Sequence, residues 1–134
     1  VLIDFRGGYF WGMDEWQLIL VVDGERVQLK TLRRGLTING YRVIEAISGR
    51  EALDQYNRNK QIDLILTDYS MPEMDGLDLL RKIREKNKTM PIVLMSAYGN
   101  KDLAKEAMHD HCNAFIDKPF DMKELLSVIK NVLV

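Results

Sequence analysis

Short apolar segments alternate with amphipathic ones five times between residue 18 and the end of the chain. The apolar segments have the length and residue types of β-strands, and they lie at residues 18–22, 41–46, 63–67, 91–96 and 114–117. Each is followed by apolar residues at helical spacing, as in the stripe of Val27, Leu29, Leu32 and Leu36. Strands that alternate with helices in this way predict a parallel sheet with right-handed crossovers and helices on both faces.

The third strand carries the strongest signal, because residues 62–67 are apolar on both strand faces, which is typical of a central parallel strand. We therefore expect an α/β fold with a doubly wound (βα)5 sheet, the flavodoxin-like strand order 2-1-3-4-5 and three α/β/α layers. Ser48 and Asp75 are expected to cap the second and third helices. The helix residues expected to face the core are Ala52, Leu53, Tyr56, Leu77, Leu80, Ile83, Leu103, Ala107, Met108, Met122, Leu125, Leu126, Ile129, Val132 and Leu133.

Length and composition indicate one domain, at residues 17–134 of the 134. The net charge is −1, and basic and acidic residues are interspersed, which argues against a nucleic-acid surface. No apolar run approaches the roughly 20 residues of a membrane span. The single Cys112 excludes an internal disulfide framework. We expect a cytoplasmic protein that contacts neither nucleic acid nor membrane directly.

Residues 1–16 differ from the rest, because they interleave aromatic residues and glycines without a helical or strand period. The segment also lacks the basic start and the cleavage site of a signal peptide. We interpret it as an N-terminal extension that is non-native or a linker. Its first 12 residues would be vector-derived, an upstream translation, or the tail of a preceding region. Mass spectrometry of the native protein would decide between these origins.

Four chemically suited residues follow the predicted strands. Asp23, Asp68, Ser96 and Lys118 should meet at one edge of the sheet, where the carboxyl ends of parallel strands bind ligands. Two carboxylates in one place repel each other unless a cation lies between them, and Mg²⁺ suits two carboxylates and a backbone carbonyl. Lys118 and the Ser96 hydroxyl could hold phosphoryl oxygens, with Asp68 as the nucleophile.

These residues lie in motifs that resemble the receiver domains of two-component response regulators, the CheY-like superfamily. The resemblance covers residues 18–134 and rests on four ordered segments, at residues 19–23, 68–76, 94–97 and 118–120. It implies that Asp68 accepts a phosphoryl group from a phosphohistidine. It also implies magnesium ligation by Asp23, Asp68 and the main-chain carbonyl of Ser70, a switch formed by Ser96 and Phe115, and phosphate binding by Lys118 beside a cis Lys118–Pro119 peptide.

The resemblance further implies a signalling module and not an enzyme. Its partners would be a sensor histidine kinase or a histidine phosphotransfer protein, and an effector domain or partner protein. Kinases of the family dock near the first helix and the fifth loop, which assigns partner binding to Arg26, Lys30 and Pro119; a merely solvated basic face is the alternative. A homodimer through the fourth helix, the fifth strand and the fifth helix is also possible.

Two positions depart from the family pattern. Gly24 stands where the family has a second acidic residue that touches the metal, so we expect weaker magnesium binding and poorer phosphorylation, unless water or Glu25 fills the gap. His111 stands where the family tends to have glycine, which predicts a left-handed histidine or a shifted helix cap.

Two other functions remain as alternatives. The first is a pseudo-receiver that binds a partner without phosphorylation, which Gly24 motivates directly. The second is a flavin-binding relative of flavodoxin or a phosphatase, but Gly24-Glu25-Arg26 is not a phosphate-cradling loop. His109, His111 and Cys112 match no standard zinc spacing, and Cys112 is interpreted as a small buried residue.

Overall fold

The computed structural model describes residues 3–4, 9–10, 15–97 and 99–134 of the chain. Five parallel strands form the main sheet, in the order β4-β3-β5-β6-β7. Numbered within this sheet, the order is 2-1-3-4-5, so the predicted topology is confirmed. The strands are β3 (Leu18–Val22), β4 (Arg42–Ala46), β5 (Ile62–Asp68), β6 (Ile92–Ala97) and β7 (Ala114–Lys118).

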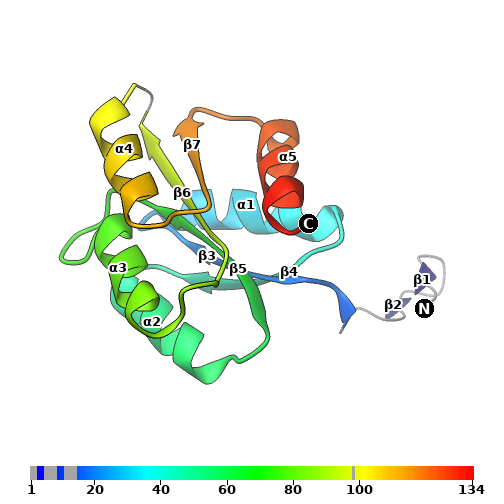
Figure 1. Cartoon of the computed structure of the whole chain (residues 1–134). Coiled ribbons are helices and arrows are strands. Elements are labelled where there is room, and N and C mark those ends of the chain that lie inside the picture. The colour runs from blue at the N-terminus through cyan, green and yellow to red at the C-terminus, as the bar shows by residue number, and fades with distance from the viewer. Residues whose placement is uncertain (1–2, 5–8, 11–14, 98) are drawn as a thin grey trace.

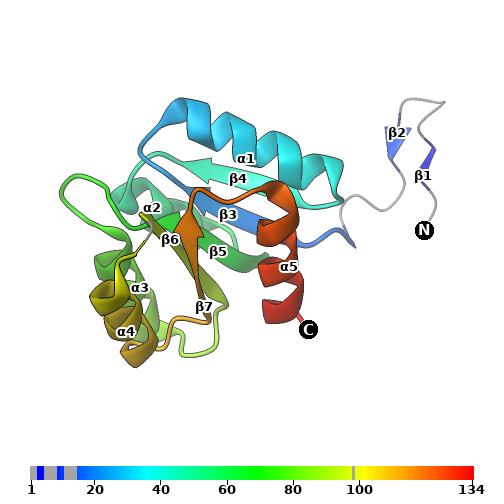
Figure 2. The ribbon, with the colours of Figure 1, turned by 90° about the horizontal axis from the view of Figure 1, so that it is seen from above.

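Helices cover both faces of the sheet, as Figures 1 and 2 show. They are α1 (Arg26–Ile38), α2 (Gly49–Arg58), α3 (Gly76–Lys86), α4 (Lys101–His109) and α5 (Met122–Val132). One buried cluster joins the sheet to α1 and α5, and the other joins it to α2, α3 and α4. The protein is therefore the three-layer α/β/α sandwich that the sequence predicts.

The central strand β5 is buried on both faces. Leu64 and Leu66 belong to the cluster beneath α1 and α5, whereas Ile65 belongs to the opposite cluster. Because burial of both faces fixes the register of a strand, the last residue of β5 has a defined position at the carboxyl edge of the sheet. That residue is Asp68.

Side-chain caps begin the helices on the α2–α4 face as predicted. The Ser48 hydroxyl accepts a hydrogen bond from the N–H of Glu51 at the start of α2. Asp75 caps α3 and forms a reciprocal capping box with Asp78. Such a cap fixes where the loop after β5 ends and α3 begins.

Two predictions of core residues are wrong. Val27 is 77% exposed and Met108 is 53% exposed. Val27 lies two residues before the buried Leu29, and positions i and i+2 point to different sides of a helix. Met108 directly follows the buried Ala107, and one residue turns the helix by about 100°, away from the face that buries Leu103 and Ala107. Periodicity identified each helix correctly but assigned these two residues to the wrong side.

Little of the N-terminal extension belongs to the described residues. β1 (Ile3–Asp4) and β2 (Tyr9–Phe10) form a two-residue antiparallel pair, where the sequence showed no strand period. The proposed origin of residues 1–12 is not tested and mostly concerns positions outside the described residues. Within the described part of the chain, no helix has the length and apolar character to cross a membrane.

Candidate functional site

Three strands bring a lysine and two carboxylates together at the carboxyl edge of the sheet. Lys118 Nζ lies 3.0 Å from Asp68 Oδ1 and 3.5 Å from Asp23 Oδ2. Asp23 directly follows β3, Asp68 ends β5 and Lys118 ends β7. Residues separated by up to 95 positions thus form one ion-paired cluster, as their positions at strand ends predict.

Burial sets the electrostatics of this cluster. Asp23 is 1% exposed and Asp68 is 8% exposed. Burial raises the pKa of Asp68; the hydrogen bond and charge of Lys118 oppose this shift, and the Asp23 charge adds to it. Burial also acts to lower the pKa of Lys118, but its contacts with Asp68 and Asp23 outweigh burial and leave that pKa raised. The ammonium therefore remains charged between the two acids.

Ser96 lies one residue beyond Met95, which is the register partner of Asp68 on β6. Its side chain is buried near the carboxyl edge, as predicted. Phe115 is half-buried at the second position of β7, where it packs against the cluster beneath α2–α4. It also lines a cavity of about 230 Å³ with residues of the α4 start, including Ala104.

The loop between β5 and α3 carries Ser70, which is exposed. The loop turns sharply at Glu73, which has φ +67°, while the N–H of Met74 donates to the carbonyl of Pro72. Gly76 ends the loop, because a Cβ there would collide with the carbonyl oxygen of Asp68. The sequence analysis did not predict this close approach of Gly76 to Asp68.

Gly24 has space for a side chain, because apart from its two chain neighbours no atom lies within 4 Å of a Cβ built on it. Glu25 contacts Asp23 through its backbone, because its N–H donates to Asp23 Oδ1 at 2.9 Å. This bond from residue i+2 is an Asx turn, which the Asp-Gly pair could have signalled. The Glu25 side chain helps to line a cavity of about 370 Å³ with Gln28 and Lys118.

These oxygen donors fit a hard divalent cation with few protein ligands. The buried carboxylates of Asp23 and Asp68 both lie next to the Lys118 ammonium. Mg²⁺ prefers carboxylate oxygens as ligands and keeps several waters. No group of three or more acidic, histidine or cysteine side chains suited to a metal occurs among the described residues. The donor set therefore suits Mg²⁺ but has one carboxylate fewer than the family pattern.

The residues assigned to partner binding lie on the surface near the same edge. Arg26, Lys30 and Pro119 are all exposed, and Pro119 follows a cis peptide bond, as predicted. His111 has φ +68°, which confirms the predicted left-handed histidine. Cys112 is a free, buried thiol.

Comparisons with known proteins agree on one family. The family model described as the response regulator receiver domain matches residues 19–130. The chemotaxis protein CheY of Treponema pallidum is 36% identical over 117 residues, which cover 86% of this chain and 81% of that protein. The response regulator MprA of Mycolicibacterium vanbaalenii is 35% identical over 115 residues, which cover 86% of this chain and 49% of MprA. The chain thus spans about half the length of MprA.

Solved structures show the same likeness. A response regulator receiver domain protein from Clostridium thermocellum superposes with a TM-score of 0.84 at 31% identity, covering 87% of this chain and 94% of that one. NtrX from Brucella abortus, solved in complex with ADP, superposes with a TM-score of 0.82 at 29% identity. The superposition covers 88% of this chain but 27% of NtrX.

Proposed function

The chain belongs to the family of response regulator receiver domains, and we propose that it is a phosphorylation switch in which Asp68 is the phosphoacceptor. The observation that carries the proposal is the position of Lys118 Nζ, within 3.5 Å of carboxylate oxygens of both Asp23 and Asp68. A half-buried lysine so placed supplies positive charge where transferred phosphoryl oxygens would lie.

In the proposed reaction, an Asp68 oxygen attacks the phosphorus of a phosphohistidine on a kinase or phosphotransfer protein. The P–O bond to Asp68 forms as the P–N bond breaks, and the bonding electron pair returns to the imidazole nitrogen. Lys118 then pairs with the phosphoryl oxygens. Mg²⁺, held by Asp23, Asp68 and the Ser70 carbonyl when bound, would neutralise further charge on these oxygens.

The output would be a population shift. The phosphoryl group would favour the conformation in which the Ser96 hydroxyl and the Phe115 ring move inward, which reshapes the face of α4, β7 and α5. The half-buried position of Phe115 beside a cavity supports this role, because the ring has space into which it can move. The same face would serve for homodimerisation or for an effector domain.

Acetyl phosphate with Mg²⁺, followed by intact-mass measurement, tests the phosphoacceptor. The wild-type chain should gain one phosphoryl group and Asp68→Asn none. An adduct retained by Asp68→Asn would refute the assignment of Asp68.

Gly24 supports a second candidate, a pseudo-receiver that binds a partner without phosphorylation. This function predicts no adduct on the wild type and an adduct on Gly24→Asp, since the variant restores the missing carboxylate. A wild-type adduct under the same conditions would exclude it.

The proposed kinase-docking surface consists of Arg26, Lys30 and Pro119. Helix α1 has four basic residues and no acidic one, which favours an acidic partner surface. Charge reversal at Arg26 and Lys30 should slow transfer from a phosphorylated kinase far more than transfer from acetyl phosphate. Equal slowing with both donors would place the defect in Asp68 chemistry and not in docking.

A further inference from the structure

We propose that the open edge of the sheet along β4 is a docking groove for an extended acidic segment of another protein, which adds to the sheet as a strand. The groove begins near the amino ends of β3 and β4, whereas Asp68 lies at the carboxyl end of the sheet. The proposal therefore does not depend on phosphorylation.

The backbone of β4 can accept a further strand. β4 is the terminal strand of the five-stranded sheet, and among the described residues it pairs with β3 alone. The N–H of Arg42 donates to the segment before β3, and the carbonyl of Ala46 accepts from the residue after β3. Because successive residues of a strand face opposite sides, Val43 and Glu45 direct their N–H and C=O groups away from β3.

The Arg33 side chain covers part of this edge. Arg33 of α1 donates from Nη2 to the Val43 carbonyl at 3.3 Å, and its Nε lies 3.2 Å from Glu45 Oε1. Covering the edge in this way protects a strand from unwanted pairing. The Arg33 and Glu45 side chains are 49% and 33% exposed. Exposed ion pairs contribute little to stability, so an incoming strand can displace Arg33 readily.

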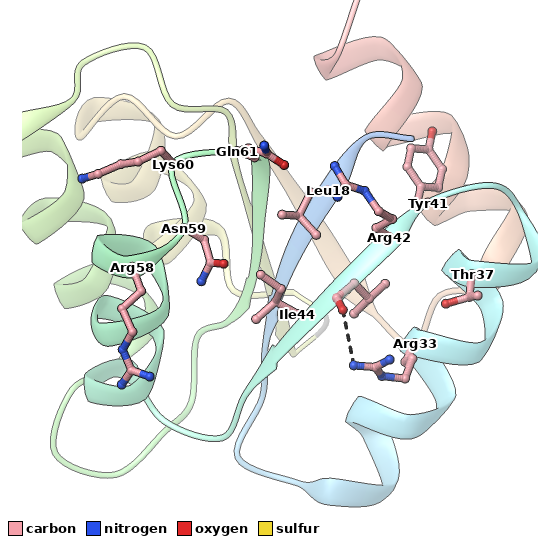
Figure 3. A pocket seen from close by; sticks show the side chains of 11 residues that line it. Leu18, Arg33, Thr37, Tyr41, Arg42, Ile44, Arg58, Asn59, Lys60 and Gln61 are labelled. Carbon is pink, nitrogen blue, oxygen red and sulfur yellow. Dashed lines mark hydrogen bonds between the residues drawn. The ribbon is translucent and has the colours of Figure 1, made fainter. Parts of the chain in front are cut away.

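The groove over this edge is strongly basic. A cavity of about 620 Å³ has four cationic side chains and no carboxylate among its lining residues. Figure 3 shows that the cations do not converge: Arg33 extends from α1, Arg42 from β4, and Arg58 and Lys60 from the end of α2 and the loop after it. Cations spread around the groove match an extended polyanion better than a compact anion.

The side of the sheet on which the cations lie predicts which positions of the bound segment are acidic. Ile44 packs against the cluster beneath α2–α4, so Arg42, two residues earlier on the strand, lies on that same side of the sheet. Arg58 and Lys60 lie on that side as well. Alternate side chains of an added strand would lie on the side of the sheet that holds these three cations, which calls for an acidic residue at every second position. A second copy of this chain would instead bring like charges together.

Fluorescence anisotropy with a labelled, end-blocked peptide of about eight residues that alternates glutamate and valine tests the proposal. A peptide that alternates lysine and valine is its matched control. The glutamate peptide should bind at least tenfold more tightly. Its binding should also slow hydrogen exchange at the amides of Val43 and Glu45, which face away from β3.

Variants distinguish the contribution of the cationic side chains to peptide binding from that of the backbone hydrogen bonds of β4. Joint replacement of Arg58→Glu and Lys60→Glu should weaken binding of the glutamate peptide at least tenfold, whereas Lys130→Glu on α5 should leave it unchanged. Val43→Pro removes an outward N–H without removing a bond to β3, and it should abolish the slowed exchange at Glu45. Circular dichroism and urea unfolding of each variant would show that the fold is intact.

Four results would overturn the proposal. The first is equal binding of the two peptides. The second is tighter binding of the glutamate peptide with unchanged exchange at Val43 and Glu45, which would indicate charge attraction without strand addition. The third is displacement of the peptide by inorganic phosphate at an equal concentration, which would indicate a site for a compact anion. Concentration-dependent dimers in sedimentation that compete with the peptide would identify a second copy as the occupant and refute the acidic segment.

Discussion

Replacing Gly24 by aspartate would supply the carboxylate that the acidic site lacks. The position accepts a side chain, because a Cβ there meets no atom within 4 Å and the backbone does not have the left-handed φ that favours glycine. The variant therefore changes the charge of the site without an expected loss of packing. We expect tighter Mg²⁺ binding and faster phosphorylation of Asp68.

The magnitude follows from the charges. At an effective dielectric constant of about 20, unit charges about 4 Å apart interact by about 4 kcal/mol, so a carboxylate and Mg²⁺ gain about 8 kcal/mol. Removal of water from the ion and the carboxylate offsets most of this gain. A remainder of roughly 1.5–3 kcal/mol would lower the magnesium Kd about tenfold to hundredfold. Without metal, repulsion from Asp23 and Asp68 should destabilise the variant by up to about 1 kcal/mol.

Thermal unfolding over a series of Mg²⁺ concentrations, with calorimetry, measures both effects. Gly24→Asp should melt below the wild type without Mg²⁺ and above it when the ion is abundant, because a ligand that binds the folded state stabilises it. Gly24→Asn is the matched neutral control and should not produce this crossing. Equal magnesium affinities of wild type and Gly24→Asp, or an equal gain from Gly24→Asn, would refute the reasoning.

Three further substitutions test local features by urea unfolding. His111→Gly should raise the free energy of unfolding by up to about 1 kcal/mol, because relief of the left-handed conformation exceeds the added glycine entropy; His111→Ala should give no gain. Arg84→Met should lower the free energy of unfolding by roughly 2–4 kcal/mol, because this buried guanidinium donates to the carbonyls of His111 and Asn87. A loss below about 1 kcal/mol would contradict this structural role of Arg84. Gly76→Ala should lower the free energy of unfolding by about 1–3 kcal/mol and slow phosphorylation, because the new Cβ collides with the Asp68 carbonyl. Unchanged stability would show that the loop after β5 can shift to accommodate the Cβ.

The fold and the acidic cluster were predictable from sequence for one physical reason. Parallel strands all end at one edge, so residues that directly follow the apolar segments must meet there. This places Asp23, Asp68 and Lys118 together without knowledge of any distance. The buried position of Ser96 follows in the same way, because it lies at the end of β6.

Features that depend on neighbouring elements were not predictable. The close approach of Gly76 to the Asp68 carbonyl depends on the path of the loop after β5. The Arg33 contact with the edge of β4 depends on how α1 packs. In each case, the deciding contact comes from a segment that is distant in sequence or irregular in conformation.

The absence of an acid at Gly24 also changes how phosphorylation and magnesium should influence each other. Asp23, Asp68 and Lys118 together carry a charge of about −1, and a phosphoryl group on Asp68 makes this more negative by up to about one unit at neutral pH. The added charge acts in place of the missing carboxylate, so phosphorylation should tighten Mg²⁺ binding, and by reciprocity Mg²⁺ should stabilise the phosphorylated form. Gly24→Asp already has the third carboxylate and should gain proportionally less. The magnesium dependence of the melting temperature, measured before and after treatment with acetyl phosphate, compares the two proteins. An equal or larger gain in the variant would show that the phosphoryl group does not compensate for the missing acid.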